Sequence, residues 1–538
     1  MRYLPRFLLI AVASLLVTFS FTTSNSLAAA GGLTLPAGFV DEVAYDGLLA
    51  PRAFTFTPDG RVLVVERGSA ASDNPSLASI RVFKNGTLLP TRAYTLNTCG
   101  DSERGLLGIT VDPDFLNNGY IYIYYTRQAT AGPVSDACAK GTFASGNTGG
   151  PRNRISRLTM SGDEVVTSPD SERVLIDSII TEQGNHNAGD LHFGPDGYLY
   201  ASTGDGAVTW TSPDTGTLNG KIIRILPTAG DAGGYTTTGN PYDGDPLSRT
   251  CSLPSDIHAQ GHSTGPCKEI YAKGFRNPFR FTMQPDMAGI PGTGSPFIGD
   301  AGQNTWEEVD QVQTAGGDYG WPVREGFCAN GIMCTPPYQS GGYDNPIYAY
   351  SHQVGSSSVS SVIIGGDFYT GGANYPPQYV NNYFFAEFER GFISRLIYSG
   401  GQWVVQDFAT GGSGIIGLKR GLDGNLYYLT FTSPTARTNT IRRIRYVAPA
   451  NAAPARNYFT TDTPTLTWNR VTFAHHYVLQ VSKTSDFMGA TTYQAGSNLT
   501  FTLPSYADGY YYWRVAACSS AVTCDNWSAT DTFVVDGP

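Results

Sequence analysis

Short runs of alternating apolar and polar residues, separated by turn-forming residues, recur along most of the chain. Clear examples are AFTFTPDGRVLVVERG, LHFGPDGYLYASTGDG and GLKRGLDGNLYYLTF. Alternation with a period of two on both sides of a Pro-Asp-Gly-like turn is typical of a β-hairpin. Three further hairpins are predicted at GITVDPDFLNNGYIYIYYT, at FRFTMQPD with SPFIGDAG, and at VIIGGDFYTG with NYFFAEFERGFISRL.

Six hairpin units at irregular spacing favour an all-β fold made of repeated sheets. Each unit is longer than the common propeller repeats of roughly 40–50 residues, so long loops are expected between the strands. We therefore predict a six-bladed β-propeller over residues 36–445. Abundant glycine (63 residues) and proline (33 residues) suit many strands joined by tight turns.

The pattern changes after Arg445. The stretch VAPANAAPARN predicts a linker over residues 446–456, and the segments TPTLTWN, HYVLQVSK and YYYWRVAAC follow it. These short strands predict a small β-sandwich over residues 457–538, which resembles a fibronectin type III module. We expect this module to act as a spacer or to contact glycans or a cell surface, without a catalytic role.

The first 30 residues have the features of a cleaved signal peptide. Arg2 and Arg6 precede an apolar run from Leu8 to Phe19, and Ala28-Ala29-Ala30 form a small-residue site. No later run is long enough to predict a transmembrane anchor. We therefore expect a secreted or periplasmic protein.

Cysteine content and charge narrow the possible functions. The eight cysteines suit an oxidising compartment, and the net charge of -10 comes without a basic cluster, which argues against nucleic-acid binding. Proximity in sequence favours four local disulfides: Cys99–Cys138, Cys251–Cys267, Cys328–Cys334 and Cys518–Cys524.

The best candidates for chemistry are His186 and Asp205, at the two ends of one predicted hairpin. A carboxylate beside an imidazole selects its tautomer and raises its basicity, as a general base requires. A purely structural His-Asp pair is the alternative. The spacing of His258 and His262 in a Gly/Ser-rich loop argues against a zinc site, and Glu307 and Glu308 point to opposite faces of a strand, which argues against a glycosidase pair.

Four motifs, in order, resemble the soluble quinoprotein glucose/sorbosone dehydrogenase family: ERGLLGITVDPDFLNNGYIYIYYT, GNHNAGDLHFGPDGYLYASTGDG, KGFRNPFRF and GDAGQNTWEEVDQVQTAGGDYGWP. The resemblance covers roughly residues 36 to 445. It implies a six-bladed propeller that holds pyrroloquinoline quinone (PQQ) and Ca²⁺. It also implies that His186 removes the hydroxyl proton of a sugar while hydride passes to the quinone, and that Asp205 orients His186.

The resemblance assigns further residues one by one. Arg276 and Asn277 match residues beside the quinone, where a guanidinium would stabilise the charge that develops on reduction; an Arg-Asn pair that braces a turn is the alternative. Trp210 could stack on a sugar or a flat cofactor, or pack within its loop. The resemblance also implies that the backbone carbonyls of Gly302 and Gln303 bind the Ca²⁺ of the cofactor. It implies that Glu308 and Tyr319 lie at a second, structural Ca²⁺ site and that Glu103 contacts the substrate.

The chain departs from the family at the cations that neutralise the three PQQ carboxylates. The matching positions hold Glu389, Gly414 and Ile416. Arg390, Lys419 and Arg420 lie nearby in sequence and are possible substitutes. Two interpretations remain open: a PQQ-dependent aldose dehydrogenase that passes electrons to a soluble acceptor, and a non-catalytic, calcium-stabilised propeller that binds a glycan or a protein.

Overall fold

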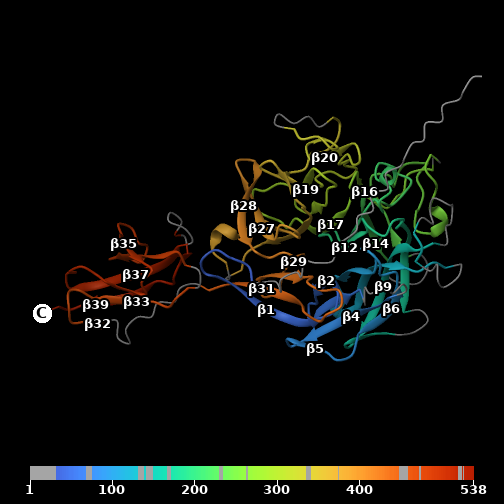
Figure 1. Cartoon of the computed structure of the whole chain (residues 1–538). Helices are drawn as coiled ribbons and strands as arrows, with labels where there is room; N and C mark the ends of the chain where they lie inside the picture. Colours follow the sequence, from blue (N-terminus) through green and yellow to red (C-terminus); the bar gives the residue numbers. More distant parts are fainter. Residues whose placement is uncertain are drawn as a thin grey trace, which may run out of the picture.

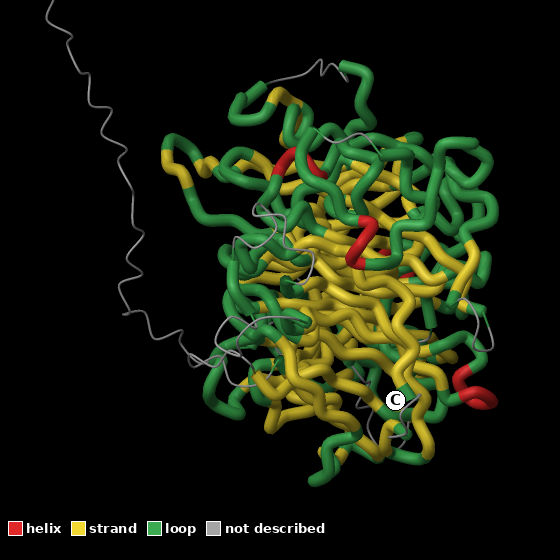
Figure 2. The backbone as a smooth tube through the Cα atoms, turned by 90° about the vertical axis from the view of Figure 1, so that its right-hand side faces the viewer, coloured by secondary structure: helices red, strands yellow, loops and turns green. Residues whose placement is uncertain are grey.

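Strands dominate the protein, and the helices are single turns. The computed structural model describes residues 32–67, 76–130, 138–140, 150–166, 171–228, 234–261, 264–334, 341–372, 375–447, 458–471, 474–518, 524 and 526–537. Within these ranges the helices are α1 (Phe115–Asn118), η2 (Thr209–Thr211), η3 (Pro254–Asp256) and η4 (Pro377–Tyr379) (Figure 2). The all-β prediction is therefore confirmed.

Six sheets of four or five antiparallel strands account for most of the chain up to Tyr446. The first three are β2 (Pro51–Phe56), β3 (Val62–Glu66), β4 (Ser76–Lys84), β5 (Thr87–Leu88) and β6 (Tyr94–Thr98); β7 (Leu106–Val111), β8 (Tyr120–Arg127), β9 (Arg152–Ser161), β10 (Glu164–Val165) and β11 (Glu172–Ile180); and β12 (Ala188–Phe193), β13 (Leu199–Thr203), β14 (Lys221–Pro227), β15 (Tyr235–Thr236) and β16 (Ile270–Lys273).

The other three sheets are β17 (Pro278–Met283), β18 (Pro296–Asp300), β19 (Trp306–Gln311) and β22 (Tyr348–Ser351); β25 (Ile363–Tyr369), β26 (Asn382–Glu387), β27 (Phe392–Ser399) and β28 (Gln402–Thr410); and β29 (Ile415–Arg420), β30 (Leu426–Thr430), β31 (Asn439–Tyr446) and β1 (Phe39–Leu48). Two small hairpins lie in the loops, β20 (Arg324–Glu325) with β21 (Cys328–Ala329) and β23 (Gln353–Val354) with β24 (Ser357–Ser358). Each of the six predicted hairpins forms the first two strands of one sheet, so these predictions are confirmed.

The first strands of the six sheets lie next to one another. Contacts run from β2 to β7, then to β12, β17, β25 and β29, and β29 also contacts β2. In Figure 1 the labelled first strands, β2, β12, β17 and β29, lie towards the middle of the six sheets, whereas β5 and β28 lie at the periphery. Residues on the first strands of all six sheets can therefore face one shared central space.

Strand β1 completes the last sheet, because it pairs with β31 although nearly 400 residues separate them in sequence. Asp41 and Glu42 of β1 form ion pairs with Arg442 and Arg443 of β31, at 2.8 and 2.5 Å. Phe39 is fully buried, and its ring contacts the rings of four aromatic residues at centroid distances of 4.9 to 5.1 Å: Tyr375, Tyr379, Phe408 and Tyr446.

The strands after Tyr446 form a separate group, drawn in red at the left of Figure 1. Buried Trp468, Leu479, Trp513 and Phe533 belong to their common core, which also includes Ala37 from the segment before β1. The predicted resemblance to a fibronectin type III module stays a prediction. One sheet contains β32 (Tyr458–Phe459), β34 (His476–Ser482), β35 (Thr491–Gly496), β37 (Gly509–Cys518), β38 (Asn526–Trp527) and β39 (Asp531–Val535), and β33 (Thr465–Thr467) pairs with β36 (Thr500–Thr502).

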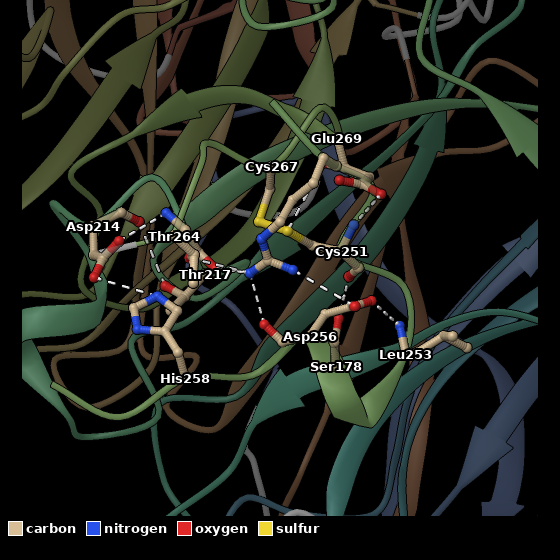
Figure 3. The surroundings of a disulfide bond; sticks show 12 residues. Ser178, Asp214, Thr217, Cys251, Leu253, Asp256, His258, Thr264, Cys267 and Glu269 are labelled. Atoms are coloured by element: carbon tan, nitrogen blue, oxygen red, sulfur yellow. Dashed lines mark hydrogen bonds and ion pairs between the residues drawn. A yellow bond between two sulfur atoms is a disulfide. The ribbon is translucent and has the colours of Figure 1, made fainter. Parts of the chain in front are cut away.

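All four predicted disulfides are present. Figure 3 shows the bond between Cys251 and Cys267, which joins the segment around η3 to the start of β16. Glu269 lies beside this bond and accepts hydrogen bonds from the Cys251 amide at 2.9 Å and the Tyr235 hydroxyl at 2.5 Å. Burial raises the pKa of Glu269. The disulfide therefore holds a loop over a buried polar cluster.

Among the described residues, we find no helix with the length and apolar character that a bilayer crossing would need. The predicted signal peptide, residues 1–30, lies outside the described residues, as do His262 and most of the predicted linker.

We expect Phe39→Ala to destabilise the protein by about 3–5 kcal/mol, because it removes a fully buried ring from the contact between β1 and the fifth and sixth sheets. Thermal and urea unfolding of the purified variant would measure this loss. Val43→Ala on the same strand is the matched control, since Val43 is 49% exposed. Equal effects of the two substitutions would contradict the importance of this closing strand.

Candidate functional site

His186 and Asp205 lie in the loops at the same end of β12 and β13. His186 precedes β12 and has a left-handed backbone with φ of 54°, which is uncommon for a residue with a side chain. Gly204 allows this approach, because a Cβ atom there would lie only 2.0 Å from the His186 carbonyl oxygen. The Gly206 amide also donates to that oxygen, at 3.1 Å. The local backbone thus brings the imidazole beside the carboxylate.

The imidazole of His186 lies between a carboxylate and a guanidinium. Its Nδ1 is 2.7 Å from Asp205 Oδ1, and its Nε2 is 2.8 Å from Nη2 of Arg276. A guanidinium only donates hydrogen bonds, so Nε2 carries the lone pair in this arrangement and Nδ1 carries the proton that Asp205 accepts. Both neighbours therefore favour the same tautomer.

Several donors hold Asp205, which is fully buried. Its Oδ1 also accepts from the Ala207 amide at 2.7 Å, and its Oδ2 accepts from the Trp321 indole nitrogen at 2.8 Å. Lys221 holds the loop after Asp205, because its Nζ donates to three backbone carbonyls of that loop at 2.5 to 2.8 Å. These contacts fix the carboxylate plane against the imidazole.

Arg276 and Asn277 form the second wall of the site. Asp300, at the end of β18, accepts the backbone amides of both, at 2.9 and 2.7 Å. Burial raises the pKa of Asp300 to about 7. The Asn277 side chain accepts from the Ala188 amide at 3.0 Å, so it also fixes the start of β12.

Beside these residues is a cavity of about 250 Å³, slightly smaller than common small-molecule sites of roughly 300 Å³ and above. Its wall includes residues on or next to the first strand of each sheet: Arg52, Leu107, Ala188, Arg280, Ile364 and Ile416. Glu103, Asn187 and Asn277 give it a polar side. The predicted substrate residue Glu103 thus lies at the cavity, where its Oε2 is 3.5 Å from Nδ2 of Asn277.

Trp210 does not line this cavity. It lies in η2, and its ring is 5.8 Å from the ring of His258. This position favours packing within the loop over stacking on a ligand.

The positions that lack the expected cations lie as follows. Glu389 is exposed and lines the cavity, Ile416 is a buried part of its wall, and the Gly414 amide donates to the Phe388 carbonyl at 2.8 Å. The three possible substitutes from the sequence do not line the cavity: Arg390 lies over the ring of Phe392, Lys419 contacts His192, and Arg420 donates to Gly371.

Gly302 and Gln303 lie in a loop organised by one carboxylate. Oε1 of Glu325, which is buried, accepts four consecutive amides, those of Gln303, Asn304, Thr305 and Trp306, at 2.7 to 3.2 Å. Because these amides point towards Glu325, it fixes the orientation of the peptide units that follow Gly302.

Glu308 and Tyr319 lie near a group of buried carboxylates. Asp310 is fully buried, and neither of its carboxylate oxygens has a hydrogen-bond partner among the described residues. Burial, and then repulsion from Asp300, raises the pKa of Glu308; burial, and then repulsion from Glu308, raises the pKa of Asp310. Buried carboxylates without partners are costly, and a cation is the natural partner for them.

Sequence reasoning missed several residues that shape the site. Trp321 and Asp300 lie inside the quoted motifs, in YGWP and GDAG, and this placement was the only available signal for them. Arg280 likewise lies inside the quoted motif KGFRNPFRF. Glu325 and Arg52 carry no local signal, because only the packing of distant loops and strands brings them to the site.

Comparisons with known proteins identify relatives of this chain. The quinoprotein glucose dehydrogenase B of Acinetobacter calcoaceticus is 24% identical over 302 residues, which cover 54% of this chain and 53% of that protein. The HIPL2 protein of Arabidopsis thaliana is 27% identical over 322 residues, 53% of this chain and 43% of that protein. The chain thus spans about half the length of these relatives.

The fold is shared with solved structures. The soluble aldose sugar dehydrogenase of Escherichia coli in its apo-form superposes with a TM-score of 0.56 at 20% identity, covering 76% of this chain and 99% of that one. The family described as glucose/sorbosone dehydrogenase matches residues 48–437. This match includes the six sheets' first strands and every residue of the His186 site, so the chain belongs to the glucose/sorbosone dehydrogenase family.

Proposed function

We propose that the protein is an exported sugar dehydrogenase, dependent on PQQ and Ca²⁺, that oxidises the anomeric hydroxyl of an aldose to a lactone. The observation that carries this proposal is the imidazole of His186, held by Asp205 and Arg276 so that Nε2 is the nitrogen that carries the electron pair. Family membership supports a sugar dehydrogenase in general.

We further propose that the six sheets are the blades of a closed propeller and that the cavity is its central channel. The contacts between neighbouring first strands, including the contact from β29 back to β2, support this arrangement. The four disulfides support export to an oxidising compartment.

The cavity has the chemistry that a flat, anionic quinone requires. Phe279 and Phe431 offer aromatic surface, Asn277 offers an amide, and Arg52 and Arg280 offer positive charge. Arg276 and Asn277 would hold the quinone, and the backbone of Gly302 and Gln303 would hold its Ca²⁺. A quinone held there would supply a two-electron acceptor for the hydride of the anomeric carbon, and a soluble acceptor would reoxidise it.

The protein's own residues would move the proton. Nε2 of His186 accepts the anomeric hydroxyl proton, and the carboxylate of Asp205 stabilises the imidazolium that results. The substrate hydroxyl takes the place that Nη2 of Arg276 occupies at Nε2. Arg276 remains anchored through Nη1, which donates to the Ala301 carbonyl at 2.8 Å, and its freed Nη2 can stabilise developing negative charge.

Glu103 would contact the sugar from the polar side of the cavity. The loop with Trp210 and the strands after Tyr446 lie outside this cavity. We propose that the C-terminal strands contact glycans or a cell surface.

We expect Asp205→Asn to lower kcat by about 10²–10⁴-fold, because an amide neither stabilises the imidazolium nor favours the correct tautomer. Steady-state assays with a panel of aldoses and an artificial electron acceptor would measure this loss. The control is Asp177→Asn, which removes a buried carboxylate bound to Arg127 and Arg154 instead. A kcat of Asp205→Asn equal to that of the wild type would contradict this mechanism.

A second candidate function is a non-catalytic, calcium-stabilised propeller that binds a glycan or a protein. The absence of cations at Glu389, Gly414 and Ile416 favours it, since these are the expected partners of the PQQ carboxylates. Melting curves with added PQQ and Ca²⁺ separate the two candidates. A shift that Arg276→Ala abolishes, with turnover that His186→Ala abolishes, supports the enzyme, and the absence of both supports the binder.

We propose that Ca²⁺ binds at the carboxylates around Glu308 and Tyr319. Calcium should raise the melting temperature of chelator-treated protein. Asp310→Asn should raise the melting temperature of the calcium-free protein by about 1 °C per kcal/mol gained and reduce the calcium shift, because it removes a buried charge without a partner. Asp114→Asn, at an exposed carboxylate, should change neither value. A calcium shift that is unaltered in Asp310→Asn would place the ion elsewhere.

A further inference from the structure

Among the described residues, two arginines in the cavity wall form no ion pair with a carboxylate. Arg52 lies on β2 and Arg280 lies on β17, and both line the cavity beside Asn277. Within the described residues, neither guanidinium lies within 4.0 Å of a carboxylate oxygen.

All the hydrogen bonds of these two guanidinium groups go to backbone carbonyls. Arg280 donates to the carbonyls of Arg52 at 2.6 Å, Ile416 at 3.3 Å and Phe279 at 3.3 Å. Arg52 makes a single long contact, 3.4 Å from Nη1 to the Pro51 carbonyl. Most donors of the Arg52 guanidinium are therefore available to a ligand.

The two positive charges are close together and poorly solvated. Arg280 is 4% exposed and Arg52 is partly buried. Burial lowers the pKa of both groups. The charge of Asp190 offsets part of this effect at Arg280; at Arg52 the charges of Arg67 and Arg280 lower the pKa further, and Glu103 offsets part of the loss. Phe431 and Phe279 place their rings 4.4 and 4.5 Å from the two guanidinium carbons, which offsets only part of this cost. A buried cation without a counter-ion is unfavourable unless an anion joins it.

The positions of the two arginines correspond to the missing cations. Arg280 reaches across from β17 and contacts the carbonyl of Ile416 on β29, where the family has a cation. Arg52 lies on β2, which contacts β29, and its guanidinium lies over Phe431 just after β30. Positive charge lost from the fifth and sixth sheets is thus supplied from the first and fourth sheets.

We infer that Arg52 and Arg280 form a carboxylate-binding subsite of the cavity, in place of the cations missing at Glu389, Gly414 and Ile416. The subsite accepts a carboxylate of a flat aromatic ligand through charge-assisted hydrogen bonds, with the neighbouring phenylalanine rings against the ring system. This inference rests on the proposed function in that PQQ is its expected occupant. It also resolves the argument for the non-catalytic alternative, because the cavity is not without cations.

Arg52→Met is the most informative variant, because Arg52 makes almost no contact that the fold needs. The melting temperature of the ligand-free variant should be equal to or higher than that of the wild type, since an unpaired cation is removed. Its affinity for PQQ, measured by isothermal titration calorimetry, should fall by at least about tenfold, and Arg52→Lys should retain most of the affinity. Arg280→Gln should weaken binding as well.

Arg395→Met is the matched control. Arg395 is also a buried arginine over an aromatic ring, 4.4 Å from that of Tyr379, but it lies outside the cavity. Its substitution should leave the affinity for PQQ unchanged.

Pyridine-2,6-dicarboxylate, an aromatic dicarboxylate without a quinone, separates the two hypotheses. If wild type and Arg52→Met bind PQQ equally, the subsite is refuted and the proposed function stands. If the wild type binds only the dicarboxylate, and Arg52→Met does not, the subsite stands and the proposed function fails. If the wild type binds neither compound, both are refuted.

Discussion

The hydrogen-bonded row from Trp321 through Asp205 and His186 to Arg276 is the interaction on which the proposed chemistry depends. Each group in this row has one hydrogen-bonding role: the indole of Trp321 donates to the carboxylate, the carboxylate accepts, and the guanidinium of Arg276 donates to the imidazole ring. The imidazole therefore holds its proton on Nδ1 and its electron pair on Nε2 without any change of conformation. Such preorganisation is what proton transfer at neutral pH requires.

The surrounding fold supplies the positions of these groups from elements that are distant in sequence. His186 and Asp205 come from one hairpin, Arg276 precedes β17, and Trp321 lies in the long connection after β19. Buried polar side chains fix the connecting loops through backbone groups: Lys221 through three carbonyls, Asp300 through two amides and Glu325 through four. Long loops between short strands could otherwise adopt many conformations, so these charged side chains replace regular secondary structure as the means of order.

Charge distribution distinguishes two parts of the molecule. Among the described residues, Arg52 and Arg280 at the cavity form no ion pair with a carboxylate, and Glu308 and Asp310 near Tyr319 form none with a cation. Both arrangements are unfavourable in an isolated protein and become favourable with ligands of opposite charge. An anionic aromatic ligand at the first site and a metal ion at the second would each supply that charge.

The sequence by itself determined the strands, the disulfide pairs and the His186, Asp205 and Arg276 set. These features are local or motif-bound: alternation in side-chain polarity follows the two-residue period of a strand, the paired cysteines are close in sequence, and the site residues lie in long motifs. Only the tertiary structure decided that Asp300, Glu325 and Trp321 support the site, that Arg390, Lys419 and Arg420 do not face the cavity, and that Arg52 and Arg280 do. The reason is that the first strands of six separate sheets lie side by side around the cavity. The residue pattern along one strand does not specify which side chains of the neighbouring strands will lie next to its own.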